Sequence, residues 1–260
     1  MQAKTLADFK QHAIDAYPAE CCGLVVSQGR KELYVRCANL AGEAQDSEHQ
    51  GVKERVQFVM DHKDFQRAED LGQVVALCHS HPDEAATPSH ADKYECELMH
   101  EHGQGVPWFI VSVAKDMDGS TQCFDVQGFA PEGWQAPLIG RQFSHGRLDC
   151  WQLVRDWWKR ERGIDIPDFE REDDWWHKGQ DLYVDHVRDA GFEPMDSREP
   201  LQVGDLIVMQ IRAPKANHGG VFIGNTRMLH HMHGYLSEST VYGGYWAEVT
   251  RFCARHRSML

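Results

Sequence analysis

A break in the residue pattern across residues 130–146 constrains the fold of this chain more than any other feature. The segment APEGWQAPLIGRQFSHG contains two prolines and three glycines and shows neither helical nor strand periodicity, which is typical of a linker. Before it, strand-like and helical patterns are mixed; after it, helical patterns come first and strand patterns follow. We therefore predict two different α+β domains, at residues 1–132 and 144–260, joined by a linker at 133–143.

Composition excludes several classes of function. The formal net charge of -13 argues against a nucleic-acid-binding surface, which needs clustered lysine and arginine. Apolar runs such as VVALC at 74–78 are too short to cross a bilayer, so no membrane insertion is expected. Residues 1–18 lack a continuous apolar stretch and predict no signal peptide. The eight cysteines contain no CxxC pair and are expected to be free thiols of a protein made in a cytoplasm.

The first half reads as a mixed sheet flanked by helices. Strands are expected at 21–28, 31–40 and 73–81, with a hairpin formed by 108–116 and 121–129. Helices are expected in the remaining periodic segments, namely 1–18, 52–72 and 89–103.

Two histidines at the end of a predicted strand form the first candidate site. Side chains alternate along a strand, so His79 and His81 in the stretch CHSHPDEAATPSHAD point to the same face. Such a pair suits zinc, with Asp92 as third ligand. An ordinary helix cap is the competing interpretation, since Ser89 and Asp92 have capping-box spacing. Glu20, before an early strand, could act as general base and favours the metal site.

Taken together, PAECCG and HSHPx6SxxD resemble the JAMM (MPN-plus) metalloprotease family over about residues 1–130. The resemblance implies that His79, His81 and Asp92 bind Zn²⁺. It further implies that Glu20 transfers the proton and that Ser89 stabilises the oxyanion.

A cysteine at a predicted helix start forms the second candidate site. Asp149 is a natural N-cap for the segment CWQLVRDWW, and this places Cys150 in the first turn of a helix. Helix amides point outward there, so we expect a depressed thiol pKa, lowered further by a nearby histidine. The competing interpretation is that Cys150 is only one more small buried residue among the eight cysteines. The paired tryptophans at 157–158 and 175–176 are expected in the core and the cleft wall.

The Asp-Cys pair and the later strands GDLIVMQIR and NHGGVFIGNTRMLHH resemble the NlpC-type cysteine peptidases, whose fold is papain-like, with helices followed by a small antiparallel sheet. The resemblance implies Cys150 as nucleophile, His218 as general base and His230 as the residue that orients the base. Trp151-Gln152 stand where that family commonly has Ser-Gly, which puts the substrate in doubt. A three-residue turn at 225–227 would place His230 beside His218, and a two-residue turn would favour His231. The HHMH cluster could alternatively form a second metal site.

The order of the two domains resembles the tail tip assembly protein K family of long-tailed bacteriophages and prophages, over nearly the whole chain. The resemblance implies a bifunctional hydrolase: a zinc-dependent (iso)peptidase, and a cysteine endopeptidase that cuts peptidoglycan stem peptides. Other tail tip proteins would be its partners, and it would move from the host cytoplasm to the virion tail tip. Two alternatives stay open: a structural assembly factor with vestigial sites, or a bacterial enzyme acting on ubiquitin-like conjugates.

Overall fold

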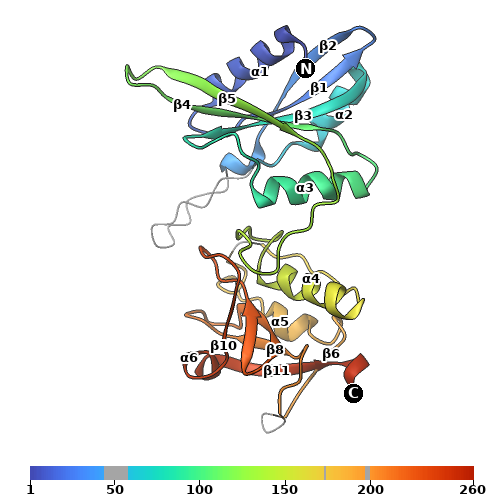
Figure 1. Cartoon of the computed structure of the whole chain (residues 1–260), viewed down its shortest axis with the longest axis vertical. Coiled ribbons are helices and arrows are strands. Elements are labelled where there is room, and N and C mark those ends of the chain that lie inside the picture. The colour runs from blue at the N-terminus through green and yellow to red at the C-terminus, as the bar shows by residue number, and fades with distance from the viewer. Residues whose placement is uncertain (44–57, 173, 197–199) are drawn as a thin grey trace. The chain divides into compact units, whose positions relative to one another are not determined.

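The computed structural model describes residues 1–43, 58–172, 174–196 and 200–260 (Figure 1). The chain forms two compact units, Met1–Trp134 and Gln135–Leu260. Arg141, within the segment expected as a linker, is fully buried in the second unit, and its Nε donates to the carbonyl of Pro137 at 2.8 Å. The second unit therefore begins before the end of that segment. In the described residues, no helix is long and apolar enough to span a bilayer.

The described part of the first unit is a mixed five-stranded sheet with helices on both faces (Figure 1). The strands lie in the order β2-β1-β3-β4-β5 and pair antiparallel, except for the parallel pair β3 and β4. The elements are α1 (Ala3–Ala16), β1 (Cys22–Gln28), β2 (Lys31–Cys37), the 3-10 turn η1 (Leu40–Glu43), α2 (His62–Leu71), β3 (Gln73–Pro82), α3 (His90–Glu101), β4 (Trp108–Lys115) and β5 (Thr121–Phe129).

Alternation along β3 sends its side chains into two different apolar layers. Cys78 packs with Phe9 and Ala13 of α1. Leu77 packs on the opposite face, against Ala68 of α2 and Cys96 of α3. His79 and His81 share the parity of Leu77 and therefore face α3. Cys78 has the opposite parity and faces away from them.

The second helix is shorter than the sequence pattern predicted. It begins at His62 because the Asp61 side chain caps it, accepting a hydrogen bond from the Lys63 amide at 3.0 Å. Phe58–Met60 are not helical, and Met60 instead forms a β-bridge with Asn39. The prediction of a helix over residues 52–72 was wrong at residues 58–60, because extended pairing holds this part of the segment; residues 52–57 lie outside the described residues.

The second unit packs helices on an antiparallel sheet with the order β10-β9-β8-β7-β11-β6. This confirms the predicted architecture of helices followed by a small sheet. Between residues 164 and 190, however, the described chain forms only one α-helix, the short α5. The elements are α4 (Cys150–Arg162), α5 (Leu182–His186), β6 (Phe192–Pro194), β7 (Leu206–Met209), β8 (His218–Gly224), β9 (Arg227–His230), β10 (Glu238–Val241), α6 (Tyr245–Glu248), β11 (Thr250–His256) and the 3-10 turn η2 (Arg257–Met259).

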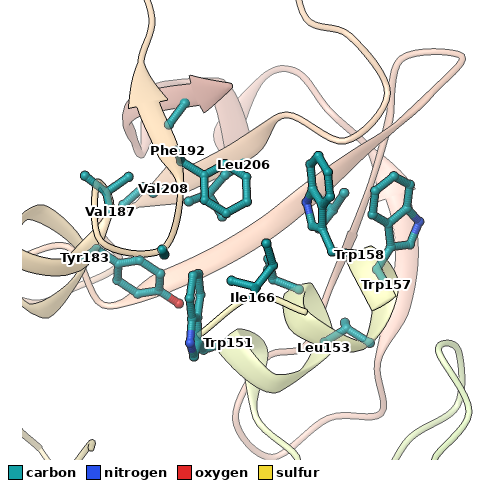
Figure 2. Close-up of a cluster of buried hydrophobic side chains, with 14 of the residues drawn as sticks. Trp151, Leu153, Trp157, Trp158, Ile166, Tyr183, Val187, Phe192, Leu206 and Val208 are labelled. Carbon is teal, nitrogen blue, oxygen red and sulfur yellow. The ribbon is translucent and has the colours of Figure 1, made fainter. Parts of the chain in front are cut away.

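Large aromatic side chains fill the layer between α4 and the sheet (Figure 2). Trp151, Trp158 and Trp175 are each at most 2% exposed, and Trp157 is 6% exposed. Trp157, Trp158 and Trp175 therefore lie in the core, as expected, and the partly buried Trp176 packs against it. A fully buried tryptophan or leucine stabilises the folded state by roughly 1.5–3 kcal/mol or more, so this layer anchors the start of α4.

A buried ion pair ties β11 to the start of β7. The guanidinium of Arg255 donates from Nε to Asp205 Oδ1 at 2.9 Å and from an Nη to Oδ2 at 2.7 Å. The Asp205 side chain is fully buried and that of Arg255 is 8% exposed. Removing one partner would leave the other charge buried without compensation.

We expect Asp205→Ala to lower the free energy of unfolding of the second unit by about 3–5 kcal/mol. Urea denaturation followed by tryptophan fluorescence measures this, since six of the eight tryptophans lie after residue 150. Lys178→Ala is the control: it breaks the exposed pair between Lys178 and Glu172, which is worth about 0–1 kcal/mol. Equal effects of the two substitutions would contradict the prediction.

Candidate functional sites

Three side chains converge between β3 and the start of α3. His79 Nε2 lies 3.2 Å from His81 Nε2. The Asp92 carboxylate approaches both rings, with Oδ1 3.1 Å from His79 Nε2 and Oδ2 3.4 Å from His81 Nε2. The three ligand atoms lie within 4.8 Å of one another. The structure thus brings together the predicted metal ligands.

The capping box of α3 holds Asp92 in this position. The Ser89 side chain accepts from the Asp92 amide at 3.1 Å, and the Ser89 amide donates to Asp92 Oδ2 at 2.6 Å. The Ser89 hydroxyl donates to the same Oδ2 at 2.6 Å. The same Asp92 side chain therefore takes part in the helix cap and approaches both histidines. The helix-cap interpretation and the metal-site interpretation of this motif are compatible.

Opposing effects act on the Asp92 carboxyl. Burial by itself would raise its pKa. The positive charge that His79 can carry, with hydrogen bonds from His79, His81 and Ser89, outweighs burial and holds the pKa of Asp92 well below its usual range. Asp92 is therefore a carboxylate at neutral pH, the form that binds a cation.

The donor set fits zinc. Two imidazole nitrogens and one carboxylate oxygen, with room for a fourth ligand, is a common catalytic zinc environment. His79 and His81 are 0% and 2% exposed, and His79 packs against the rings of Phe58 and Trp108 at centroid distances of 4.8 and 5.8 Å. Such an apolar wall limits solvent access and dielectric around a bound ion. Among the described residues this is the only group of three or more potential ligand side chains placed to hold a metal ion, and no histidine of the HHMH segment belongs to it.

Glu20 lies just before β1, at the same end of the sheet as these ligands. Cys22 pairs with His79, and the Cys21 amide donates to Ser80 Oγ at 2.8 Å. β1 and β3 run antiparallel, so Cys21 follows the Cys22–His79 pair opposite Ser80. Continuing this register by one more residue places Glu20 opposite His81. Its carbonyl accepts from Asn39 Nδ2 at 2.9 Å.

Cys150 begins α4, as the sequence predicts. The Asp149 side chain caps this helix by accepting from the Gln152 amide at 2.9 Å. The Cys150 sulfur lies 3.3 Å from the hydroxyl of Tyr183 on α5. Gly219 borders the same place, since a Cβ built there would meet the Tyr183 hydroxyl at 2.6 Å. Glycine at 219 is what lets Tyr183 approach Cys150.

The expected depression of the thiol pKa was wrong. Burial, followed by the charge of Asp149, raises the pKa of Cys150 to about 11; hydrogen bonds from Tyr183 and the Gly219 backbone, with the Arg171 charge, oppose this only in part. The expectation considered the helix terminus, but it left out the desolvation of a partly buried thiol and the capping carboxylate beside it.

Arg171 compensates the buried charge of Asp149. Its Nε donates to Asp149 Oδ2 at 2.8 Å, and both side chains are at most 5% exposed. The same guanidinium donates to Asp168 Oδ1 and to the carbonyl of Phe169, each at 2.6 Å. These bonds hold segment 168–171 against the start of α4. Arg171 and Tyr183 are site residues that the sequence did not single out.

His218 and His230 form a buried pair on neighbouring strands. His218 Nε2 lies 3.1 Å from His230 Nδ1, and the two residues are 5% and 1% exposed. Burial, followed by the charges that His230 and His231 can carry, lowers the pKa of His218 well below its ordinary value. His218 is therefore neutral at physiological pH and able to accept a proton.

A β-bulge decides which histidine meets His218. The turn between β8 and β9 has two residues, Asn225 and Thr226, and by turn length alone His231 would have been expected to share the face of His218. The register shifts between Phe222 and Gly224, so that His230 lies opposite Gly220, on the face of His218. The inference from turn length was wrong because it allowed for no bulge.

In the described contacts, the residues of the second site form two separate pairs. Cys150 contacts Tyr183, and His218 contacts His230, but no hydrogen bond joins Cys150 to His218 in the part of the chain that the structure describes. The pairs meet at Gly219, the residue after His218, whose amide faces the thiol.

Comparison with known proteins agrees with this division into two sites. Residues 2–126 match the model of prokaryotic homologs of the JAB domain, and residues 140–255 match the NlpC/P60 family. The tail tip assembly protein K of Escherichia phage N15 is 36% identical over 261 residues, covering 100% of this chain and 97% of the relative. The chain belongs to the tail tip assembly protein K family. The family's protein from Escherichia phage lambda is 33% identical over 201 residues, covering 76% of this chain and 90% of that relative.

Membership in the tail tip assembly protein K family confirms the resemblance inferred from the motifs. The two family models match the two structural units in the predicted order, JAB-like first and NlpC/P60 second. Every predicted site residue lies within one of these matches.

We expect Arg171→Met to raise the pKa of the Cys150 thiol above its value of about 11, because the Asp149 carboxylate then repels the thiolate without compensation. Alkylation of Cys150 by iodoacetamide, followed by peptide mass spectrometry across pH, measures this; the rate at about pH 9 falls several-fold. Asp149→Asn removes the charge and should shift the profile toward lower pH. An unchanged profile in Arg171→Met would contradict this account of the thiol.

Proposed function

We propose that the chain is a bifunctional tail tip hydrolase, with a zinc-dependent peptidase or isopeptidase site in the first unit and a peptidoglycan-cutting cysteine endopeptidase site in the second. The observation that carries this proposal is the convergence of His79, His81 and Asp92, in a chain whose second unit also places a cysteine at a helix start beside a buried histidine pair. The relatives' name, tail tip assembly protein K, supports a role in tail assembly and other tail proteins as partners.

In the first site, His79, His81 and Asp92 would hold the zinc ion. Zinc bound there would lower the pKa of a water molecule from about 15.7, its value in bulk water, to about 7. Glu20 is the candidate to receive the proton of the attacking water and to deliver it to the leaving amine. The Ser89 hydroxyl now donates to Asp92, so it would have to turn toward the substrate to stabilise an oxyanion.

In the second site, the Cys150 thiol would lose its proton to His218, and the sulfur would attack the carbonyl carbon of the scissile amide. His218 would then give the proton to the leaving amine, and water would hydrolyse the thioester. The contact between His230 Nδ1 and His218 Nε2 supports a role for His230 in orienting the His218 ring during this proton transfer. This mechanism requires the Cys150 sulfur to move from Tyr183 to within hydrogen-bond distance of His218.

The substrate of the second site would be the stem peptide of peptidoglycan, cut between D-glutamate and diaminopimelate. The protein would be made in the host cytoplasm and would reach the cell wall in the virion tail tip. The first site would act on a peptide or isopeptide bond, for example in a tail protein during assembly.

One observation favours a structural assembly factor instead. The Cys150 thiol has a raised pKa and bonds to Tyr183, which is a resting arrangement with low nucleophilicity. The completeness of both residue sets favours the enzyme, and the two experiments below separate the alternatives.

We expect the purified chain to release stem-peptide fragments from peptidoglycan sacculi, and we expect Cys150→Ala to abolish the release because it removes the nucleophile. Chromatography with mass spectrometry of the soluble products measures this. His79→Ala serves as the matched control and should retain the activity, since it lies in the other unit. Release that persists in Cys150→Ala would contradict the assignment of the nucleophile.

We expect the native chain to bind one zinc ion and His81→Ala to lose it, because removal of one of three protein ligands usually destroys affinity at such a site. Elemental analysis after dialysis gives the zinc content. His100→Ala, on the exposed end of α3, should bind zinc as the native chain does. Absence of zinc in the native chain, together with absence of peptidoglycan cleavage, would support the structural alternative.

A further inference from the structure

The loop that follows β3 connects a candidate zinc ligand to the neighbouring strand β4. At Glu84, in this loop, the backbone carbonyl accepts a hydrogen bond from the Ser112 hydroxyl at 2.6 Å. At the next residue, Ala85, the carbonyl oxygen lies 2.8 Å from Nδ1 of the His81 ring. Ser112, which lies on β4, therefore holds the loop that contacts His81. Ser112 has no part in the chemistry proposed above.

The contact with Ala85 determines which nitrogen of His81 carries a proton. A carbonyl oxygen can only accept, so Nδ1 of the ring is the donor. In the neutral ring Nε2 then keeps its lone pair, and Nε2 is the atom that lies near His79 and Asp92. Because zinc binds a neutral imidazole through its unprotonated nitrogen, the Ala85 carbonyl holds His81 in the tautomer and orientation that a metal ligand needs.

Ser112 stands at the position in β4 from which a side chain reaches this loop. It pairs with His81 in the parallel register of β3 and β4, so the two side chains lie on the same face of the sheet. The neighbouring Val111 and Val113 face the other way and pack in the layer that contains Phe9 of α1. The pairing of β4 with β5 shifts its register directly after Ser112, and such bulges commonly redirect side chains beside a site.

Two further bonds hold the beginning of the loop. The Asp83 amide donates to the carbonyl of Val113 at 2.8 Å. The Tyr17 hydroxyl donates to the Asp83 carboxylate, at 2.9 Å to Oδ1 and 3.1 Å to Oδ2. Asp83 has φ of 58°, a left-handed conformation that non-glycine residues seldom adopt. These bonds fix the loop at Asp83, and Ser112 fixes it at the residue directly before Ala85.

Water competes with these contacts, which is why the tether from Ser112 matters. Residues 83–85 are exposed, so their carbonyl groups can bond to solvent instead of to the protein. Ser112 is only 9% exposed and is held by the strand, so its hydroxyl is a fixed donor beneath an exposed loop. Without that hydroxyl, the loop is free to move and the Ala85 carbonyl to leave His81.

We propose that Ser112 is a positioning residue of the zinc site, which keeps the Ala85 carbonyl against His81 Nδ1 by holding the carbonyl of Glu84. This inference rests on the proposed zinc site of the first unit. In this role Ser112 does not itself bind the metal; it acts through two residues of the loop on the tautomer of one ligand. Its loss leaves the three ligand side chains in the chain but weakens their grip on the ion.

The first test is the zinc affinity of the full-length chain, measured by competition with a chromophoric chelator. We expect Ser112→Ala to weaken zinc binding about tenfold, the lower end of the effect of removing a group that orients a metal ligand. Ser112→Thr keeps the hydroxyl on a residue that strands accept, and its affinity stays within about threefold of the native value. Ser120→Ala is the matched control: it removes an exposed hydroxyl that bonds to Gln122, and it leaves the affinity unchanged.

The second test determines the tautomer of His81 in the zinc-free full-length chain. Nitrogen-15 NMR of the imidazole rings distinguishes a protonated Nδ1 from a protonated Nε2 at about pH 9, where an ordinary imidazole is neutral. His81→Gln identifies the signal by its absence. We expect a protonated Nδ1 in the native chain and in Ser112→Thr, and a mixture of both tautomers in Ser112→Ala. A merely structural role of Ser112 would lower the urea midpoint and leave the tautomer as it is.

A protonated Nε2 on His81 in the native chain would overturn the inference. So would a zinc affinity and a tautomer that Ser112→Ala leaves unchanged, or a loss that Ser112→Thr shares in full, since the hydroxyl would then not be the cause. If Ser112→Ala does not fold, Ser112→Cys takes its place, because a thiol is of similar size and donates only weakly. Absence of zinc from the native chain would contradict the proposed function instead, and the tautomer would still show whether Ser112 fixes His81.

Discussion

The alternation of side chains along β-strands is the constraint on which both candidate sites depend. In β3 it separates His79 and His81 from Cys78, which packs with α1 on the other face. In β8 it separates His218, which meets His230, from Gly219, which lies against Tyr183. A shift of one residue in either register would exchange these faces and dismantle the site. The apolar layers fix the registers, so the hydrophobic core and the candidate chemistry rest on the same pattern.

The convergence of His79, His81 and Asp92 could be predicted from the sequence because its determinants are local. Two histidines on one strand, followed within a dozen residues by a capped helix, leave few ways to arrange Asp92. The capping box on Ser89 is set by a spacing of three residues, and the structure shows it together with the contacts to His79 and His81. Local rules of this kind need no knowledge of distant parts of the chain.

The second site was harder to predict because its determinants are distant or depend on burial. The register that brings His230 to His218 depends on a bulge near residue 223, which no turn rule in the sequence reveals. Tyr183 and Arg171 reach Cys150 and Asp149 from segments more than 20 residues away. The thiol pKa depends on desolvation, which only the packed structure displays. The prediction of the second helix failed at its start for a related reason, since the β-bridge between Met60 and the distant Asn39 overrides the helical periodicity there.

Both sites use a carboxylate at the start of a helix, but they treat its charge in opposite ways. The Asp92 carboxylate accepts a hydrogen bond from the backbone amide of Ser89, the N-cap of α3, and keeps its oxygens directed at two histidines, so its charge stays available to a cation. Asp149 caps α4 by accepting a hydrogen bond from the Gln152 amide. A negative charge that stayed available there would oppose formation of the Cys150 thiolate. Arg171 neutralises it from a separate segment. A helix cap next to a metal ligand set needs no counter-charge, whereas a helix cap next to a thiol nucleophile does. The requirement for Arg171 thus follows from the placement of Cys150 directly after its cap.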